Sequence, residues 1–134
     1  MTDKSIRWRQ RFQNYEKALS QLDSAIERLN VLSGLEKEGL VQRFEYSFEL
    51  AWKTLKDYLE SQNVEAKFPR DVIKSGFQYE LISNGEIWLE MLEIRNFIAH
   101  TYDEKILKTS VSQIAFHYYP ELKKLYTFFK NQSE

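Results

Sequence analysis

Four side chains that can bind a phosphate, or do chemistry on one, lie within eight residues of the sequence. They are Arg95, Asn96, His100 and Tyr102, in the segment Arg-Asn-Phe-Ile-Ala-His-Thr-Tyr. Arginine carries a permanent charge and a planar fork of N–H donors that matches phosphate oxygens. Imidazole titrates near neutral pH and can accept or donate a proton, and the Asn96 amide can orient either the phosphate or the imidazole. The segment therefore indicates a phosphate site.

The residues around this segment predict an amphipathic helix that begins at Glu86 and ends between His100 and Asp103. A stripe of apolar residues at helical spacing is expected to form its core face: Ile87, Met91, Ile94 and Ile98. Asn96 and His100 are four residues apart and are therefore neighbours on another face. We expect Arg95, Asn96, His100 and Tyr102 to converge on the side away from the core.

The same helical wheel places Trp88, Leu92 and Ala99 near Arg95 and away from the expected core stripe. Large exposed apolar side chains usually mark an interaction site, so we expect these three residues at the interface of a two-fold dimer. Such a homodimer would bring two sets of Arg95 and His100 together. A purely structural alternative is also open, in which Arg95 pairs with Glu90 or Glu93.

The rest of the chain predicts helices throughout, because it has only four glycines and two prolines in 134 residues. Apolar periodicity places the other helices at about 3–33, 36–62, 70–82 and 104–130, with Pro69 opening the third. Pro120 predicts a kink or break near residues 117–119. We expect an all-α, up-down antiparallel four-helix bundle with an extra short helix, forming one domain over residues 1–134.

The charge and the residue types of the chain limit the kinds of partner and cofactor that we expect. The net charge of −1 gives no global basic field, so any contact with RNA must be local or strengthened by dimerisation. The chain has no cysteine and only two histidines, without a metal-binding pattern, so we expect no metal and no cofactor. No apolar run is long enough to span a membrane and the N-terminus lacks an apolar signal stretch, which predicts a cytoplasmic protein.

The segment from Arg95 to Tyr102 resembles the Arg-x4-His-x-Tyr signature of HEPN domains, and the wider chain is similar to their nucleotidyltransferase substrate-binding branch. Further matching pieces are Trp88, Asp103 and Glu104 around the signature, residues 69–74 (Pro-Arg-Asp-Val-Ile-Lys), and residues 44–59 (Phe-Glu-Tyr-Ser-Phe-Glu-Leu-Ala-Trp-Lys-Thr-Leu-Lys-Asp-Tyr-Leu). The resemblance implies a HEPN-like bundle. It also implies a metal-independent endoribonuclease, the toxin of a toxin–antitoxin pair, with Arg95, Asn96 and His100 as its catalytic residues.

The resemblance also implies a partner protein. In the toxin branch, a separately encoded minimal nucleotidyltransferase, the antitoxin, attaches AMP to the tyrosine that corresponds to Tyr102 and silences the ribonuclease. Arg95, Asn96 and Tyr102 would then also contact the substrate or nucleotide. An AMP group at Tyr102 would place negative charge beside Arg95 and fill the space that RNA needs.

Two other functions remain open from the sequence. One is a non-catalytic subunit that binds a nucleotide or substrate for a nucleotidyltransferase complex, and the other is a helical interaction protein without chemistry. The near-neutral charge favours these two, whereas the intact Arg-Asn-x3-His-x-Tyr pattern favours the ribonuclease. Glu45 and Lys53 of the second helix could border the site, but surface ion pairing, such as Glu49 with Lys53 at i,i+4, explains their pattern.

Overall fold

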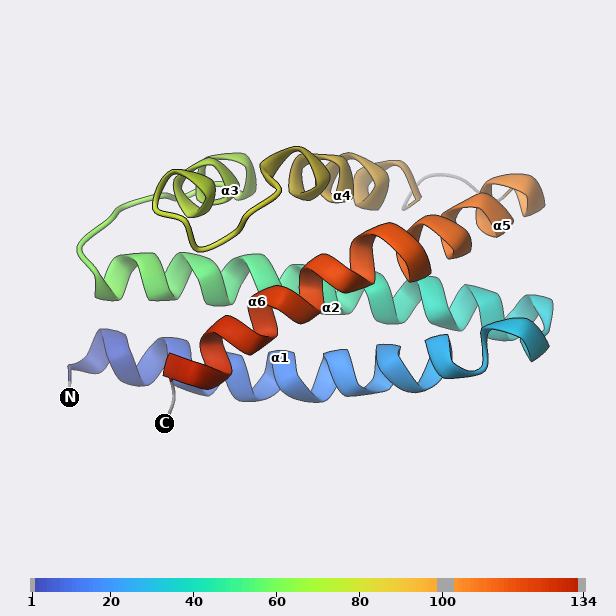
Figure 1. Ribbon diagram of the computed structural model, residues 1–134, viewed down its shortest axis with the longest axis horizontal. Coiled ribbons are helices and arrows are strands. Elements are labelled where there is room, and N and C mark those ends of the chain that lie inside the picture. The colour runs from blue at the N-terminus through green and yellow to red at the C-terminus, as the bar shows by residue number, and fades with distance from the viewer. Residues whose placement is uncertain (1, 99–102, 133–134) are drawn as a thin grey trace.

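The computed structural model describes residues 2–98 and 103–132, and all the secondary structure in this part of the chain is helical (Figure 1). The elements follow in the order α1 (Asp3–Glu27), a 3-10 turn η1 (Leu29–Val31), α2 (Gly34–Ser61), α3 (Pro69–Gln78), α4 (Gly85–Ile98), α5 (Glu104–Gln113), a π-helical turn η2 (Ile114–Tyr118) and α6 (Tyr119–Gln132).

The first two helices pack side by side as a long antiparallel hairpin (Figure 1). α1 ends at Glu27, earlier than the predicted residue 33, and Ser33 starts the next helix instead of closing the first. The Ser33 side chain accepts a hydrogen bond from the Glu36 N–H, and the Glu36 side chain accepts one from the Ser33 N–H. This capping box fixes the beginning of α2.

α3 and α4 form the third segment of the bundle, and α5, η2 and α6 form a continuous fourth that crosses α1 and α2 obliquely in Figure 1. The predicted all-α, four-segment bundle with an extra short helix is therefore confirmed. The irregularity predicted at Pro120 takes the form of the π-helical turn just before it. Proline has no N–H and its ring clashes with the carbonyl one turn back, and the widened turn accommodates both without breaking the helix.

The core lies between the hairpin and the two later segments. Its largest fully buried side chains include Tyr15, Phe44, Phe48, Trp88, Tyr118 and Phe129. The Trp88 ring packs against the Phe48 ring with their centroids 6.1 Å apart, and this contact seats α4 on α2. None of the helices in the described ranges has the length and apolar character needed to cross a membrane.

Candidate functional site

The orientation of α4 differs from the one that the sequence predicted. Trp88 is 1% exposed, Met91 is fully buried and Leu92 is 7% exposed, whereas Ile87, Ile94 and Ile98 are only partly buried. Trp88 and Leu92 therefore lie in the core of their own chain, and the prediction that they form an exposed dimer interface is wrong. The helix turns its largest apolar side chain inward, since burying an indole removes the most apolar surface from water.

This rotation directs Arg95 toward α2. Arg95 follows Trp88 by seven residues, or about two turns, so both side chains leave the same side of the helix. The Arg95 Nη2 donates a hydrogen bond to the Glu49 Oε2 at 2.6 Å, and the side chains of Arg95 and Glu49 are 32% and 28% exposed. The ionic partner of Arg95 is thus on another helix, rather than Glu90 or Glu93 on its own.

The Glu49 carboxylate has partners on both α2 and α4. Its Oε2 also accepts a hydrogen bond from the Trp52 indole Nε1 at 3.1 Å, and its Oε1 lies 3.2 Å from the Lys53 Nζ. The predicted pairing of Glu49 with Lys53 is therefore present, but it is only one contact of a larger cluster. The Trp52 ring is largely buried, so the donor on its indole is held in place.

Glu45, one turn before Glu49, is a second carboxylate close to Arg95. Burial raises the pKa of the Glu45 carboxyl, and the Arg95 guanidinium opposes this by lowering it. Arg95 therefore lies in the field of two carboxylates from α2. Glu45 was considered from the sequence as a residue that could border the site, whereas Glu49 was expected only to pair with Lys53.

Asn96 lies next to Arg95 on the exposed side of α4. Its Oδ1 accepts a hydrogen bond from the Arg95 Nη1 at 3.4 Å. The guanidinium therefore contacts a carboxylate through one terminal nitrogen and an amide through the other. The remaining predicted site residues, Ala99, His100 and Tyr102, lie outside the described residues.

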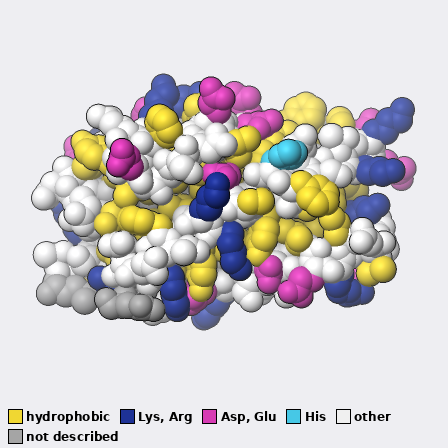
Figure 2. Space-filling model, in the orientation of Figure 1, with side chains coloured by type: hydrophobic (Ala, Val, Ile, Leu, Met, Phe, Trp, Pro, Cys, Tyr) yellow, Lys and Arg dark blue, Asp and Glu magenta, His cyan; other side chains and the backbone are white. Residues whose placement is uncertain are grey.

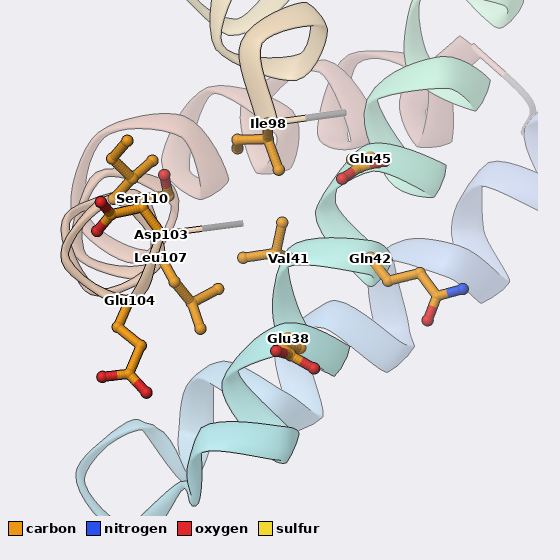
Figure 3. Close-up of a pocket in the computed structure, with 10 residues that line it drawn as sticks. Glu38, Val41, Gln42, Glu45, Ile98, Asp103, Glu104, Leu107 and Ser110 are labelled. Atoms are coloured by element: carbon orange, nitrogen blue, oxygen red, sulfur yellow. The ribbon is translucent and has the colours of Figure 1, made fainter. Parts of the chain in front are cut away.

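A pocket of about 400 Å³ lies beside this cluster, between α2, the end of α4 and the beginning of α5 (Figure 3). The described part of its lining consists of Glu38, Val41, Gln42, Glu45, Ile98, Asp103, Glu104, Ile106, Leu107 and Ser110. This lining contains four acidic residues and neither lysine nor arginine. The described part of the lining therefore disfavours a phosphate.

Charge on the surface is mixed rather than segregated. Figure 2 shows acidic and basic side chains interspersed with hydrophobic ones over one face, with no broad basic area. Among the described residues, no group of three or more His, Cys, Asp or Glu side chains is arranged to hold a metal ion.

The family model described as "Nucleotidyltransferase substrate binding protein like" matches residues 10–131, almost the whole chain. The chain belongs to this family. The resemblance to the nucleotidyltransferase substrate-binding branch of the HEPN domains is thereby confirmed.

Relatives of this chain include a protein named "Probable ribonuclease HepT" from Haemophilus influenzae. It is 27% identical over 81 residues, which is 57% of this chain and 56% of the relative, so the chain spans about half the length of that curated protein. A crystal structure from Thermus thermophilus superposes with a TM-score of 0.71 at 28% identity and covers 88% of this chain and 97% of its own.

A second solved structure has the same fold at lower identity. It is the tri-AMPylated HEPN toxin of Shewanella oneidensis in complex with an MNT antitoxin. It matches with a TM-score of 0.68 and 16% identity, covering 98% of this chain and 99% of that toxin. At this identity the likeness establishes the fold alone.

The family segment at residues 44–59 contains Glu49, the residue that the sequence did not connect with Arg95. Glu45, Glu49 and Lys53 are spaced four apart and therefore line one face of α2, which the sequence does show. It does not show that Arg95, 46 residues later than Glu49, docks on that face. Helical spacing could have found the face, but only tertiary packing assigns its partner.

Proposed function

We propose that this chain is a metal-independent endoribonuclease of the HEPN type, in which Arg95, Asn96 and His100 act on the scissile phosphate. The observation that carries the proposal is Arg95, whose side chain is about one third exposed and whose guanidinium donates a hydrogen bond to Asn96 near the end of α4. The family membership and the ribonuclease name of the Haemophilus relative support it.

The chemistry suits these residue types. RNA is cleaved when its 2′-hydroxyl attacks the adjacent phosphorus, which requires a proton acceptor, a proton donor and stabilisation of the negative charge that develops on the phosphorane. The guanidinium of Arg95 stabilises that charge, and the imidazole of His100 transfers a proton. Asn96 orients the phosphate or the imidazole through its amide.

A second proton-transfer group would come from a second copy of the chain. One copy holds a single histidine in the motif, and a two-fold homodimer would supply the other. Because Trp88 and Leu92 are buried within the chain, the contacts of this dimer involve other residues.

We further propose that a separately encoded minimal nucleotidyltransferase silences this ribonuclease by attaching AMP to Tyr102. The support is the fold shared with an AMPylated HEPN toxin that is bound to an MNT antitoxin. A phosphodiester-linked nucleotide two residues beyond His100 adds negative charge to the motif, where it competes with RNA for Arg95.

A second function is a nucleotide-binding subunit without cleavage. It is favoured by the description of the family as substrate-binding, and by Glu49, which already neutralises Arg95. In this function Arg95 and Asn96 would hold the nucleotide, and His100 would serve as a hydrogen-bond partner.

Incubation of the purified protein with RNA in EDTA separates the two functions. The ribonuclease is expected to cleave without metal, and His100→Ala is expected to abolish cleavage. His117→Ala is the matched control, because His117 is the other histidine of the chain and lies exposed in the π-helical turn. Absence of cleavage by the unmodified chain, together with retained binding of a nucleotide, would support the binding subunit instead.

A further inference from the structure

Glu49 of α2 holds α4, the helix that carries Arg95 and Asn96, through contacts that differ from those of an ordinary surface ion pair. A typical exposed pair joins two mobile side chains and contributes little. Here both carboxylate oxygens have partners, and the same Oε2 accepts from the Trp52 indole and from the Arg95 guanidinium. Because the Trp52 ring is largely buried, its indole N–H restrains the carboxylate in addition to Arg95.

The backbone of α4 is fixed two turns before Arg95 by the contact between Trp88 and Phe48. The Arg95 side chain is therefore restrained at both ends. The backbone of α4 holds its base, and the Glu49 Oε2, which accepts from its Nη2, holds the guanidinium. A guanidinium has five N–H donors, and the Glu49 and Asn96 bonds use only part of this set. The side chain remains about one third exposed, so it is not shut away from a phosphate in solution.

We infer that Glu49 is the positioning residue of Arg95, holding one terminal nitrogen so that the rest of the guanidinium meets the phosphate in a single orientation. The inference rests on the proposed ribonuclease function. A donor that is already oriented requires no reorganisation when charge develops on the phosphorane, and this is how preorganised groups lower a barrier.

The negative charge of Glu49 has a second, opposite effect. It reduces the attraction of Arg95 for RNA before any reaction occurs, because a neighbouring carboxylate repels phosphate. Removal of that charge without a change of shape should therefore leave KM unchanged or lower it, while kcat falls. A residue that only supports the fold would not separate the two constants in this way.

The first test is steady-state cleavage of an RNA oligonucleotide by Glu49→Gln. We expect kcat to fall by roughly 10- to 100-fold, with KM equal to or below that of the unmodified chain. Glu60→Gln is the matched control, because Glu60 also pairs with a lysine of α2 at i,i−4 and neither of them contacts Arg95 in the described structure. A kcat within twofold of the unmodified chain, or above it, would overturn the inference, since an increase would make Glu49 a competitor of the phosphate.

The second test does not depend on cleavage. Because Arg95 and Trp52 donate to the same oxygen, Arg95→Gln should shift the NMR resonance of the Trp52 indole N–H and leave that of Trp8 in place. An unmoved Trp52 resonance would overturn the positioning contact, whatever the enzymatic result. If the unmodified chain cleaves no RNA, the proposed function fails, and this measurement alone decides whether Glu49 fixes Arg95.

Discussion

Trp88 and Arg95 lie on the same side of α4, so the side chain that anchors this helix in the core also sets the direction of the guanidinium. The indole packs on Phe48 of α2, and the guanidinium, two turns later, reaches Glu49 of the same helix. Core packing and the geometry of the candidate site are thus coupled through one helix. A substitution that disturbs the packing of Trp88 should therefore also change the orientation of Arg95.

Trp88→Ala is expected to lower the free energy of unfolding by about 3–5 kcal/mol, because it leaves a cavity in the core. Urea unfolding of the purified variant measures this. Phe116→Ala is the control, since Phe116 is 66% exposed and its loss should change stability by no more than about 0.5 kcal/mol. If Trp88→Ala instead separated two subunits and left the unfolding of each chain unchanged, the indole would belong to an interface after all.

The sequence was sufficient for the helices and the motif but not for the rotation of α4. Capping residues, apolar periodicity and the two prolines act locally, and local signals predict local structure. α4 has two apolar stripes, one with Ile87 and Ile94 and one with Trp88 and Leu92, and a helical wheel cannot decide which of them faces the core. The partner of Arg95 was missed for a related reason, because local candidates were considered and the actual carboxylate lies on another helix.

Arg11 and Asp57 form an ion pair that joins α1 to α2. The Arg11 Nε donates to the Asp57 Oδ2 at 2.7 Å, and the Asp57 side chain is only 5% exposed. Arg11→Met would leave a buried carboxylate without its cation, so we expect a loss of about 2–3 kcal/mol in unfolding free energy. Arg7→Met should cost no more than about 0.5 kcal/mol, because its 3.5 Å pair with Glu60 is exposed. Equal losses in the two variants would contradict this assignment.

Glu45 and Glu60 of α2 should affect stability with opposite signs. Burial raises the pKa of Glu45, so its ionised form costs stability above that pKa, and Glu45→Gln should stabilise the chain at pH 7. The hydrogen bond from Lys56 lowers the pKa of Glu60, so its ionised form contributes stability above the ordinary value of 4.5, and Glu60→Gln should destabilise the chain at pH 7.

Both differences should disappear in acid. Glu45 loses its cost as pH falls through its raised pKa, and Glu60 loses its contribution as pH falls from 4.5 through its lowered pKa. Thermal unfolding of the two glutamine variants and the unmodified chain, from pH 7 down to acid, measures this. Destabilisation by Glu45→Gln at pH 7 would show that pairing with Arg95 outweighs burial at this carboxylate.

Tyr102→Phe should separate catalysis from its proposed silencing. The substitution removes the hydroxyl that would receive AMP and retains the ring, so the variant should still cleave RNA, and each protein is compared with its own rate before the partner is added. Incubation with the partner nucleotidyltransferase and ATP should add AMP to the unmodified chain, detected by mass spectrometry, and stop its cleavage. The variant should gain no AMP and remain active. Silencing of the variant by the partner alone would place the inhibition in protein binding rather than in the modification of Tyr102.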